Sequence, residues 1–353
     1  MTAAVFAIPG SLDAPTGGYG YAREVIAHLR EDGIEVEILN LPETFPRPET
    51  DQLRTIVRDL GQVRSQALLI IDGLALGTYP AAMIRALGRP VVGLVHHPLG
   101  YETALEPETA AWLIANEKAV LGACSRVIAS SPFTRNVLVD EFEVFPERII
   151  VAPPGTERVA DEPYRGKRQA SSAVRLLSVG SVVPRKGHDV LVKALGRLRR
   201  RYWELDIVGS RSMDPAYDRE VREQIIQRDL EDRIRLRGEV DTEQLRALYR
   251  NAEIFVLATR YEGYGMAFAE AMSHGLPVVG TNAGNVPMLV PEEAGYLVPV
   301  DDDAALADAL GRLMEDRTLR MRLGKGGFEH AKTLPTWRES AATIGRLIRE
   351  LAP

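Results

Sequence analysis

The sequence contains a single cysteine, Cys124, so an intramolecular disulfide is impossible. A chain without disulfides fits a reducing compartment, and we expect a cytoplasmic protein. Cys124 lies near the expected end of a helix. We interpret it as a small core residue, with a reactive thiol as the less favoured alternative.

Long apolar runs are also missing. No stretch approaches the roughly 18–20 apolar residues that a transmembrane helix requires. Residues 1–9 lack a basic segment followed by a long apolar run, so no signal peptide is expected. The expected helix 51–66 mixes basic and acidic side chains, which leaves peripheral membrane contact possible but not favoured.

An excess of positive charge is absent as well. The net charge is −6, and residues 1–170 hold 16 Lys and Arg against 22 Asp and Glu, whereas residues 171–353 hold 27 of each. A nucleic-acid-binding protein needs a net basic domain or stripe, so we expect no nucleic-acid partner. The second half is the better place for an anionic phosphate ligand.

Short apolar runs alternate with stretches of helical spacing along the whole chain. Such continuous apolar strands between helices indicate parallel sheets covered on both faces. Right-handed crossovers then favour a doubly wound α/β fold with two Rossmann-like halves. The expected strands are 5–8, 36–39, 68–71, 91–95, 127–129 and 149–152, then 176–179, 205–208, 234–236, 254–258, 277–280 and 296–298.

The alternation breaks at Pro153-Pro154-Gly155 and in the polar segment 157–172. We therefore expect an N-terminal domain over 1–165, a C-terminal domain over 166–335, and a helix within 336–353 that returns to the first domain. A length of 353 residues fits two domains with one active cleft between them. The three aspartates at 301–303 are interpreted as helix-capping residues rather than metal ligands.

Two features of the first half suggest ligand contact. Gly17, Gly18 and Gly20 let backbone amides approach a ligand where a helix begins, but their spacing fits neither a dinucleotide fingerprint nor a Walker loop. Contact with phosphate or sugar and a plain tight turn both remain open there. His96 follows the fourth strand, at the edge where open parallel sheets bind ligands. We predict that it contacts a sugar or polarises a leaving group, and no third ligand supports a zinc site.

A pair of cations opens the second half. Arg185 and Lys186 lie in the loop that follows the strand ending before Gly180. Two adjacent cations at the mouth of a sheet suit a diphosphate, because Arg offers a fork of donors and Lys a point charge.

The most informative segment runs from 258 to 280 and carries Glu262 and Glu270. Between them, Gly263-Tyr264-Gly265 precedes the expected helix start near Met266, where backbone amides can cradle a phosphate. Glu262 is placed to reach a sugar attached to that phosphate. Glu270 is placed to accept both hydroxyls of a ribose, as acidic residues do in dinucleotide folds.

These motifs resemble glycosyltransferase family 4, the "group 1" transferases of the GT-B fold, which has two facing Rossmann-like domains. The resemblance covers nearly the whole chain and is specific in the second half but looser in the first. Two positions depart from the family: many relatives have arginine where this chain has Ser181, and glutamate where it has Met288. The similarity rests on the Glu-x7-Glu pair, the glycine loop between those glutamates, Gly180 to Gly187, the turn 275–278, the loop 281–287, Gly17-Gly18 and His96.

The resemblance implies a retaining, hexosyltransferase-type enzyme that uses a nucleotide-diphosphate sugar, with no cofactor and no obligatory metal. Glu262, His96, Arg185 and Lys186 would carry catalysis, with the cations and nearby amides stabilising the leaving diphosphate. The expected donor-binding residues are Gly17, Gly18, Gly180, Ser181, Gly209, Arg237, Gly263, Tyr264, Gly265, Met266 and Glu270.

The acceptor is left open as a small molecule, a glycan or a lipid-linked sugar, and the donor base, the sugar, the linkage and the oligomeric state are not readable. Two alternatives also remain at this point: a non-catalytic nucleotide-sugar binding protein, and a sugar-nucleotide epimerase of the same fold.

Overall fold

The computed structural model describes residues 3–12, 17–46, 50–103, 105–158 and 173–352. The chain forms two compact units, one of residues 1–155 with 335–353 and the other of residues 156–334. The division falls at Gly155, and the expected boundary near residue 165 lies outside the described residues.

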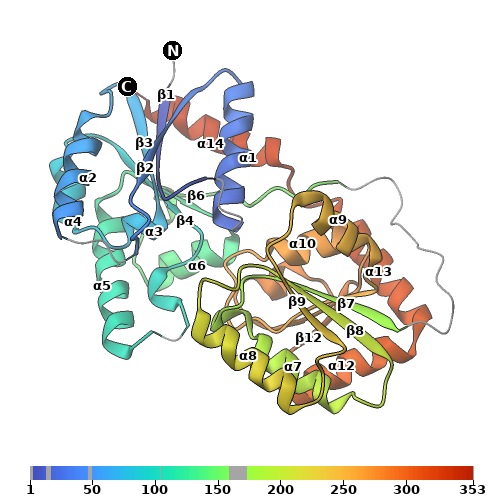
Figure 1. The fold of residues 1–353 in the computed structure, drawn as a ribbon. Coiled ribbons are helices and arrows are strands. Elements are labelled where there is room, and N and C mark those ends of the chain that lie inside the picture. The colour runs from blue at the N-terminus through green and yellow to red at the C-terminus, as the bar shows by residue number, and fades with distance from the viewer. Residues whose placement is uncertain (1–2, 13–16, 47–49, 104, 159–172, 353) are drawn as a thin grey trace. The chain divides into compact units, whose positions relative to one another are not determined.

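A six-stranded parallel sheet forms the centre of the first unit (Figure 1). Its spatial order is β2-β1-β3-β4-β5-β6, the order of flavodoxin-like sheets extended by one strand. The strands are β1 (Ala3–Pro9), β2 (Glu35–Leu41), β3 (Ala67–Asp72), β4 (Val91–Val95), β5 (Arg126–Ala129) and β6 (Ile149–Val151).

Helices cover both faces of this sheet because successive strand residues point to opposite sides. Phe6 and Ile8 pack with α1 (Gly17–Glu31) and α14 (Trp337–Leu351), while Val5 and Ala7 belong to the opposite core. That second core includes residues from α2 (Thr50–Gln62), α3 (Gly73–Leu76), α4 (Ala81–Ala86), α5 (Pro107–Ala123) and α6 (Pro132–Asp140). Short 3-10 turns η1 (Leu99–Tyr101) and η2 (Pro146–Arg148) complete the unit.

The last helix, α14, belongs to the first unit although it follows the second in sequence. It begins after Thr336, whose side chain forms a capping box with Glu339. Its buried residues include Ile344 and Ile348, which share a core with Val25 and Leu29 of α1. The helix thereby closes one face of the first sheet.

The second unit has its own six-stranded parallel sheet, ordered β9-β8-β7-β10-β11-β12. This is the 3-2-1-4-5-6 order of dinucleotide-binding folds. The two sheets therefore differ in their third strand, which lies next to the first strand in the first sheet and next to the second strand in the second sheet. The strands are β7 (Val174–Val179), β8 (Trp203–Val208), β9 (Ile234–Gly238), β10 (Ile254–Leu257), β11 (Val278–Thr281) and β12 (Gly295–Val298).

Two cores also flank this sheet. One face packs on α7 (His188–Arg197), α8 (Pro215–Gln227) and α12 (Asp303–Glu315), and the other on α9 (Thr242–Asn251), α10 (Met266–Ser273) and α11 (Val286–Leu289), with α13 (Arg317–Ala331) reaching both cores. The η3 turn (Pro184–Lys186) precedes α7.

All twelve expected strands are present, and the predicted α/β class with two Rossmann-like halves is confirmed. Cys124 is buried in the core at the end of α5, as predicted. Within the described residues, no helix is both long and apolar enough to span a bilayer.

Candidate active site

The strand order of the second sheet fixes where a ligand can bind. After β7, strands β8 and β9 are added on one side of it, and β10, β11 and β12 on the other, so the order of strand addition reverses between the hydrogen-bonded neighbours β7 and β10. In open α/β sheets, ligands bind beyond the carboxyl ends of the strands at such a switch point. The loop after β7 carries Arg185 and Lys186, and the loop after β10 carries Glu262. The fold therefore brings together motifs about 76 residues apart.

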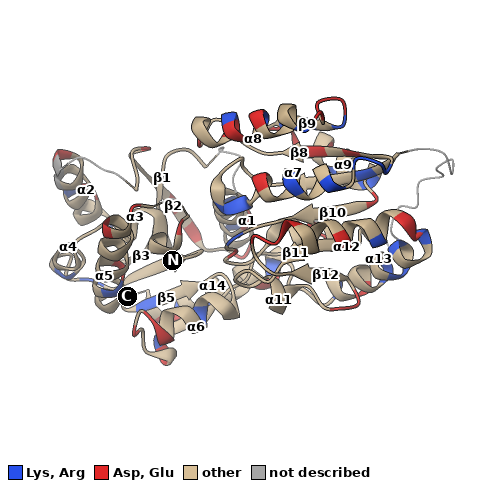
Figure 2. Ribbon diagram, turned by 90° about the horizontal axis from the view of Figure 1, so that it is seen from below, with Lys and Arg blue, Asp and Glu red and all other residues tan. Residues whose placement is uncertain are grey.

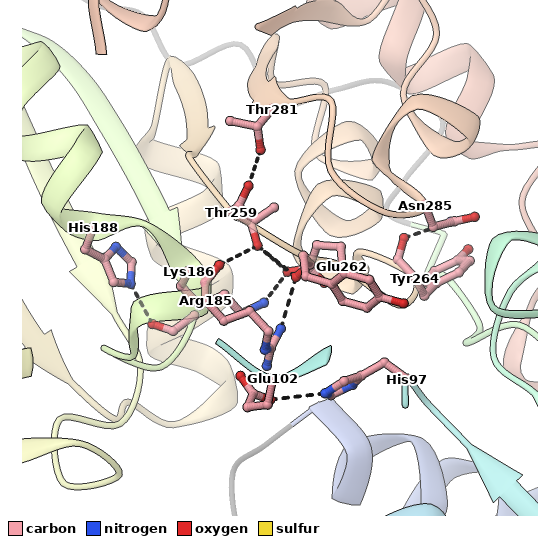
Figure 3. Close-up of polar contacts among 12 residues, drawn as sticks. His97, Glu102, Arg185, Lys186, His188, Thr259, Glu262, Tyr264, Thr281 and Asn285 are labelled. Carbon is pink, nitrogen blue, oxygen red and sulfur yellow. Dashed lines mark hydrogen bonds and ion pairs between the residues drawn. The ribbon is translucent and has the colours of Figure 1, made fainter. Parts of the chain in front are cut away.

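Lys186 and Glu262 form an ion pair at this switch point (Figure 3). Only 15% of the lysine side chain and 9% of the glutamate side chain are exposed, so water screens the pair weakly. Thr259 Oγ1 lies 3.4 Å from Glu262 Oε1 and 3.0 Å from the Arg185 carbonyl oxygen. The guanidinium of Arg185 donates to the Tyr261 carbonyl oxygen at 3.3 Å. The cations and the glutamate expected from the sequence thus share one site.

Glycines bring the backbone of this site close together. Gly265 precedes α10 with φ of 103°, a left-handed conformation that favours glycine, and Met266 opens the helix. The first amides of α10 therefore point out of the helix beside Gly263 and Glu262, where they can bind an anion. Gly209 also has positive φ, and a Cβ there would lie 2.3 Å from the Gly180 carbonyl oxygen. A side chain at Gly209 would force apart the ends of β7 and β8.

Glu270 sits one turn inside α10, and its carboxylate accepts a 2.9 Å hydrogen bond from the Tyr249 hydroxyl. Burial raises the pKa of Glu270, while the Tyr249 hydrogen bond opposes that shift. The Tyr249 ring in turn stacks on His274 at 4.9 Å, and His274 Nδ1 lies 2.9 Å from the Glu270 carbonyl oxygen. These contacts hold the carboxylate in one position.

The glycine loop 281–287 supports the Glu262 segment from the other side. The Asn285 amide donates to the Glu262 carbonyl oxygen at 2.9 Å, and Asn285 Nδ2 donates to the Tyr264 carbonyl oxygen at 2.9 Å. Gly284 has φ of 55°, and a Cβ there would lie 2.1 Å from the same Glu262 oxygen. Met288, at the position that departs from the family pattern, is exposed.

Two expected donor contacts lie at the margin of this cluster. Ser181 follows Gly180 at the end of β7 and is partly buried, and its amide nitrogen is close to Gly209. The guanidinium of Arg237 is paired with Asp206 at 2.7 Å along the β8–β9 edge. Its side chain therefore binds a neighbouring strand, and the predicted contact of this segment with the donor would be made by the backbone of Arg237 and Gly238.

The first unit contains a separate polar cluster at the carboxyl edge of its sheet. His96 follows β4, and its Nε2 lies 3.6 Å from Asp72 Oδ2. The Tyr21 ring meets the His96 ring edge-on at 5.1 Å. A Cβ on Gly18 would lie 3.5 Å from the same imidazole, so the start of α1 reaches the histidine. Gly17 begins α1 and is exposed. His96, Gly17 and Gly18 thus gather in this unit, as their sequence positions suggest.

Asp72 was missed by the sequence analysis. It ends β3, caps α3 by accepting from the Leu74 amide at 2.8 Å, and is largely buried. The following Gly73 packs so closely on β4 that a Cβ would lie 2.8 Å from the Leu94 carbonyl oxygen. An acidic residue directly after a buried apolar strand and before a glycine was the available signal.

His97, the second histidine of the pair, is committed to a local contact. Its Nε2 lies 3.1 Å from Glu102 Oε2, across the η1 turn. His96 directly follows the last residue of β4, and its contact with a sugar stays a prediction.

Across the described ranges, no group of three or more His, Cys, Asp or Glu side chains is arranged as a metal site. Two of the aspartates at 301–303 lie at the start of a helix, as the sequence suggests. Asp302 caps α12 by accepting from the Ala305 amide at 2.9 Å, and Asp303 is in the first turn of α12 and also pairs with Arg197. Asp301 pairs with Arg260.

Comparison with known proteins identifies the family. The model for glycosyl transferases group 1 matches residues 173–316, and the model for glycosyltransferase family 4 matches residues 69–158. The MMP α-(1→4)-mannosyltransferase of Mycolicibacterium hassiacum is 29% identical over 313 residues, which cover 84% of this chain and 74% of that protein.

Two solved structures share the fold over nearly the whole chain. Sucrose-phosphate synthase from Thermosynechococcus elongatus superposes with a TM-score of 0.81 at 24% identity and covers 99% of each chain. Anabaena HepE in complex with UDP-glucose gives a TM-score of 0.75 at 19% identity and covers 98% of each chain. The chain therefore belongs to the group 1, family 4 glycosyltransferases and has their GT-B fold.

Proposed function

We propose that this chain is a retaining hexosyltransferase that moves a sugar from a nucleotide-diphosphate donor to a hydroxyl-bearing acceptor, without a cofactor or a bridging metal. The observation that carries the proposal is the Lys186–Glu262 pair at the switch point of the second sheet, beside the amino end of α10. A cation, a carboxylate and free helix amides at one place suit a phosphate joined to a sugar.

The second unit supplies the parts that the donor needs. Lys186, Arg185 and the amides at Gly265 and Met266 stabilise negative charge on the diphosphate. Glu270, held by Tyr249, accepts the ribose hydroxyls. When the diphosphate binds, Lys186 exchanges part of its contact with Glu262 for a phosphate oxygen, which frees the glutamate for the hydroxyls of the transferred sugar.

The reaction breaks the bond between the anomeric carbon and the phosphate oxygen. The acceptor oxygen bonds to the anomeric carbon on the same face, and its proton passes to the leaving phosphate. Charge therefore grows on the diphosphate as the bond lengthens, and fixed donors aimed at that charge are usually the largest catalytic term. Because the leaving phosphate takes the proton, the mechanism requires no strong side-chain base.

In the first unit, we assign His96 to hydrogen bonding with a sugar hydroxyl. Asp72 Oδ2 lies 3.6 Å from its Nε2, so a carboxylate and an imidazole lie together at this edge of the sheet. The hydroxyl-binding role follows from these groups at the carboxyl edge of the sheet.

The experiment is a turnover assay of the purified chain with UDP-, GDP- and ADP-sugars, in EDTA, read by mass spectrometry with and without candidate polyol acceptors. We expect release of one nucleoside diphosphate, and NMR of the product should show the anomeric configuration of the donor. Binding without turnover would indicate the non-catalytic alternative, and interconversion of the donor sugar would indicate an epimerase. A product of inverted anomeric configuration would contradict the retaining mechanism, and loss of activity in EDTA would contradict metal independence.

A further inference from the structure

Arg260 lies two residues before Glu262 and joins both loops of the donor site. Its amide donates to the Arg185 carbonyl oxygen at 2.7 Å, and its Nη1 donates to the Pro184 carbonyl oxygen at 2.5 Å. The two contacts span the η3 turn that presents Lys186. Arg260, on the Glu262 loop, therefore holds the two carbonyl groups that come directly before Lys186 in the chain.

A buried carboxylate fixes the guanidinium in this position. Both Asp189 oxygens accept from Arg260, at 3.0 Å from Nη1 and 2.9 Å from Nη2, in a bidentate pair. Asp189 is 8% exposed and also accepts from the Tyr217 hydroxyl at 2.5 Å. Burial alone would raise the pKa of Asp189, but the hydrogen bonds from Arg260 and Tyr217 lower it. Asp189 lies in the first turn of α7, directly after the Lys186 loop.

The remaining contacts of Arg260 are weaker. Its Nε pairs with Asp301 at 2.7 Å, but that carboxylate is 55% exposed, and exposed pairs contribute little. The Asp189 fork and the two carbonyl contacts therefore fix the geometry of the site. Lysine at this position would keep the charge but lose the planar fork.

We infer that Arg260 is a positioning residue that fixes the Lys186 loop against the Glu262 loop, so that the cation and the carboxylate stay aligned for the transferring donor. The inference rests on the proposed function for its catalytic consequence. It also makes a purely structural prediction, because releasing Arg260 should loosen Lys186 whatever the chain catalyses.

The test compares Arg260→Gln with Arg320→Gln. Arg320 is an arginine of the same unit that is even less exposed than Arg260, and it contacts the Leu313 and Met314 carbonyl oxygens at 2.6 and 3.1 Å, away from the donor loops. Both variants should lose thermal stability. At a temperature where both are folded, Arg260→Gln should lower kcat by about 100-fold, the cost of roughly an ångström of misplacement. Its donor KM should change much less, and Arg320→Gln should keep the wild-type kcat.

Arg260→Lys should recover part of the lost kcat. If Arg260→Gln does not fold, Asp189→Asn removes the fork while keeping an acceptor for Tyr217, and should lower kcat in the same way. A kcat close to wild type in a folded Arg260→Gln or Asp189→Asn chain would overturn the inference.

A second readout needs no substrate. The rate of Lys186 acylation by acetic anhydride, measured by peptide mass spectrometry against Lys332 as internal reference, should rise in Arg260→Gln and stay unchanged in Arg320→Gln. An unchanged Lys186 rate in Arg260→Gln would overturn the inference. If the wild-type chain turns over no nucleotide sugar, the proposed function fails, and the acylation result still decides whether Arg260 positions Lys186.

Discussion

Glu117 provides a quantitative prediction because it is a buried carboxyl whose described contacts include no Lys or Arg. It lies on α5 with 2% of its surface exposed and accepts from the Gly100 amide at 3.2 Å. Burial raises its pKa from 4.5 to about 7, against the opposing effect of backbone hydrogen bonds from Leu99 and Gly100. The folded chain therefore holds a proton on Glu117 at pH values where the unfolded chain has released it.

The direction of the pH effect follows from that difference. The stabilising contribution is complete below the unfolded pKa of 4.5 and is lost as pH rises through the folded pKa of about 7. Each pKa unit corresponds to about 1.4 kcal/mol, so the free energy of unfolding of the first unit should fall by about 2–3 kcal/mol between roughly pH 5 and 8 from this group alone.

Glu117→Gln should remove this dependence. Urea denaturation at several pH values would show the difference between variant and wild type growing by that amount from acidic to alkaline pH, and any constant packing offset cancels. Glu108→Gln, an exposed change on the same helix, should follow the wild-type curve. Parallel curves for Glu117→Gln and wild type would contradict a raised pKa of Glu117 in the folded chain.

Three further predictions concern the second unit. Burial lowers the pKa of His188 from 6.5 to about 4, so the stability contributed by its neutral form is present above pH 6.5 and is lost as pH falls toward 4. In His188→Gln, the free energy of unfolding measured by denaturation should therefore fall by about 2–3 kcal/mol less than in wild type over that pH range. Glu270→Gln should raise the donor KM about tenfold with a smaller change in kcat, since it weakens charge-assisted hydrogen bonds to a ribose, and an unchanged KM would exclude that role. Lys186→Met should lower kcat by about 100- to 1,000-fold, the usual cost of one preorganised donor. Lys332→Met, directly after α13, should leave kcat unchanged in the same steady-state assay.

Much of this architecture was readable from the sequence because buried parallel strands are continuous apolar runs. The strand 67–72 is apolar up to its final aspartate, and all of its residues are buried. The final helix, expected within 336–353, runs from Trp337 to Leu351, and its apolar residues follow a clear helical period. Strand order was not readable, since the same alternation of strands and helices produces both the 2-1-3 and the 3-2-1 arrangements found here.

The site was readable only in part. Glu262, Glu270 and the glycines between them lie close in sequence, so local spacing reveals them. Asp72 pairs with His96 across two strands, and Arg260 meets Asp189 71 residues away. Such contacts depend on strand order and loop geometry, which single-residue patterns do not encode. For the same reason, the pairing of Arg237 with Asp206 was not foreseen.

The most direct test of the central claim is the kcat of Glu262→Ala with the donor that the wild-type chain turns over. We expect a loss of at least about 100-fold in a variant whose circular dichroism spectrum matches wild type, because we propose that the carboxylate beside Lys186 orients the transferred sugar. Full transfer activity in that folded variant would contradict the assignment of this switch point as the catalytic site.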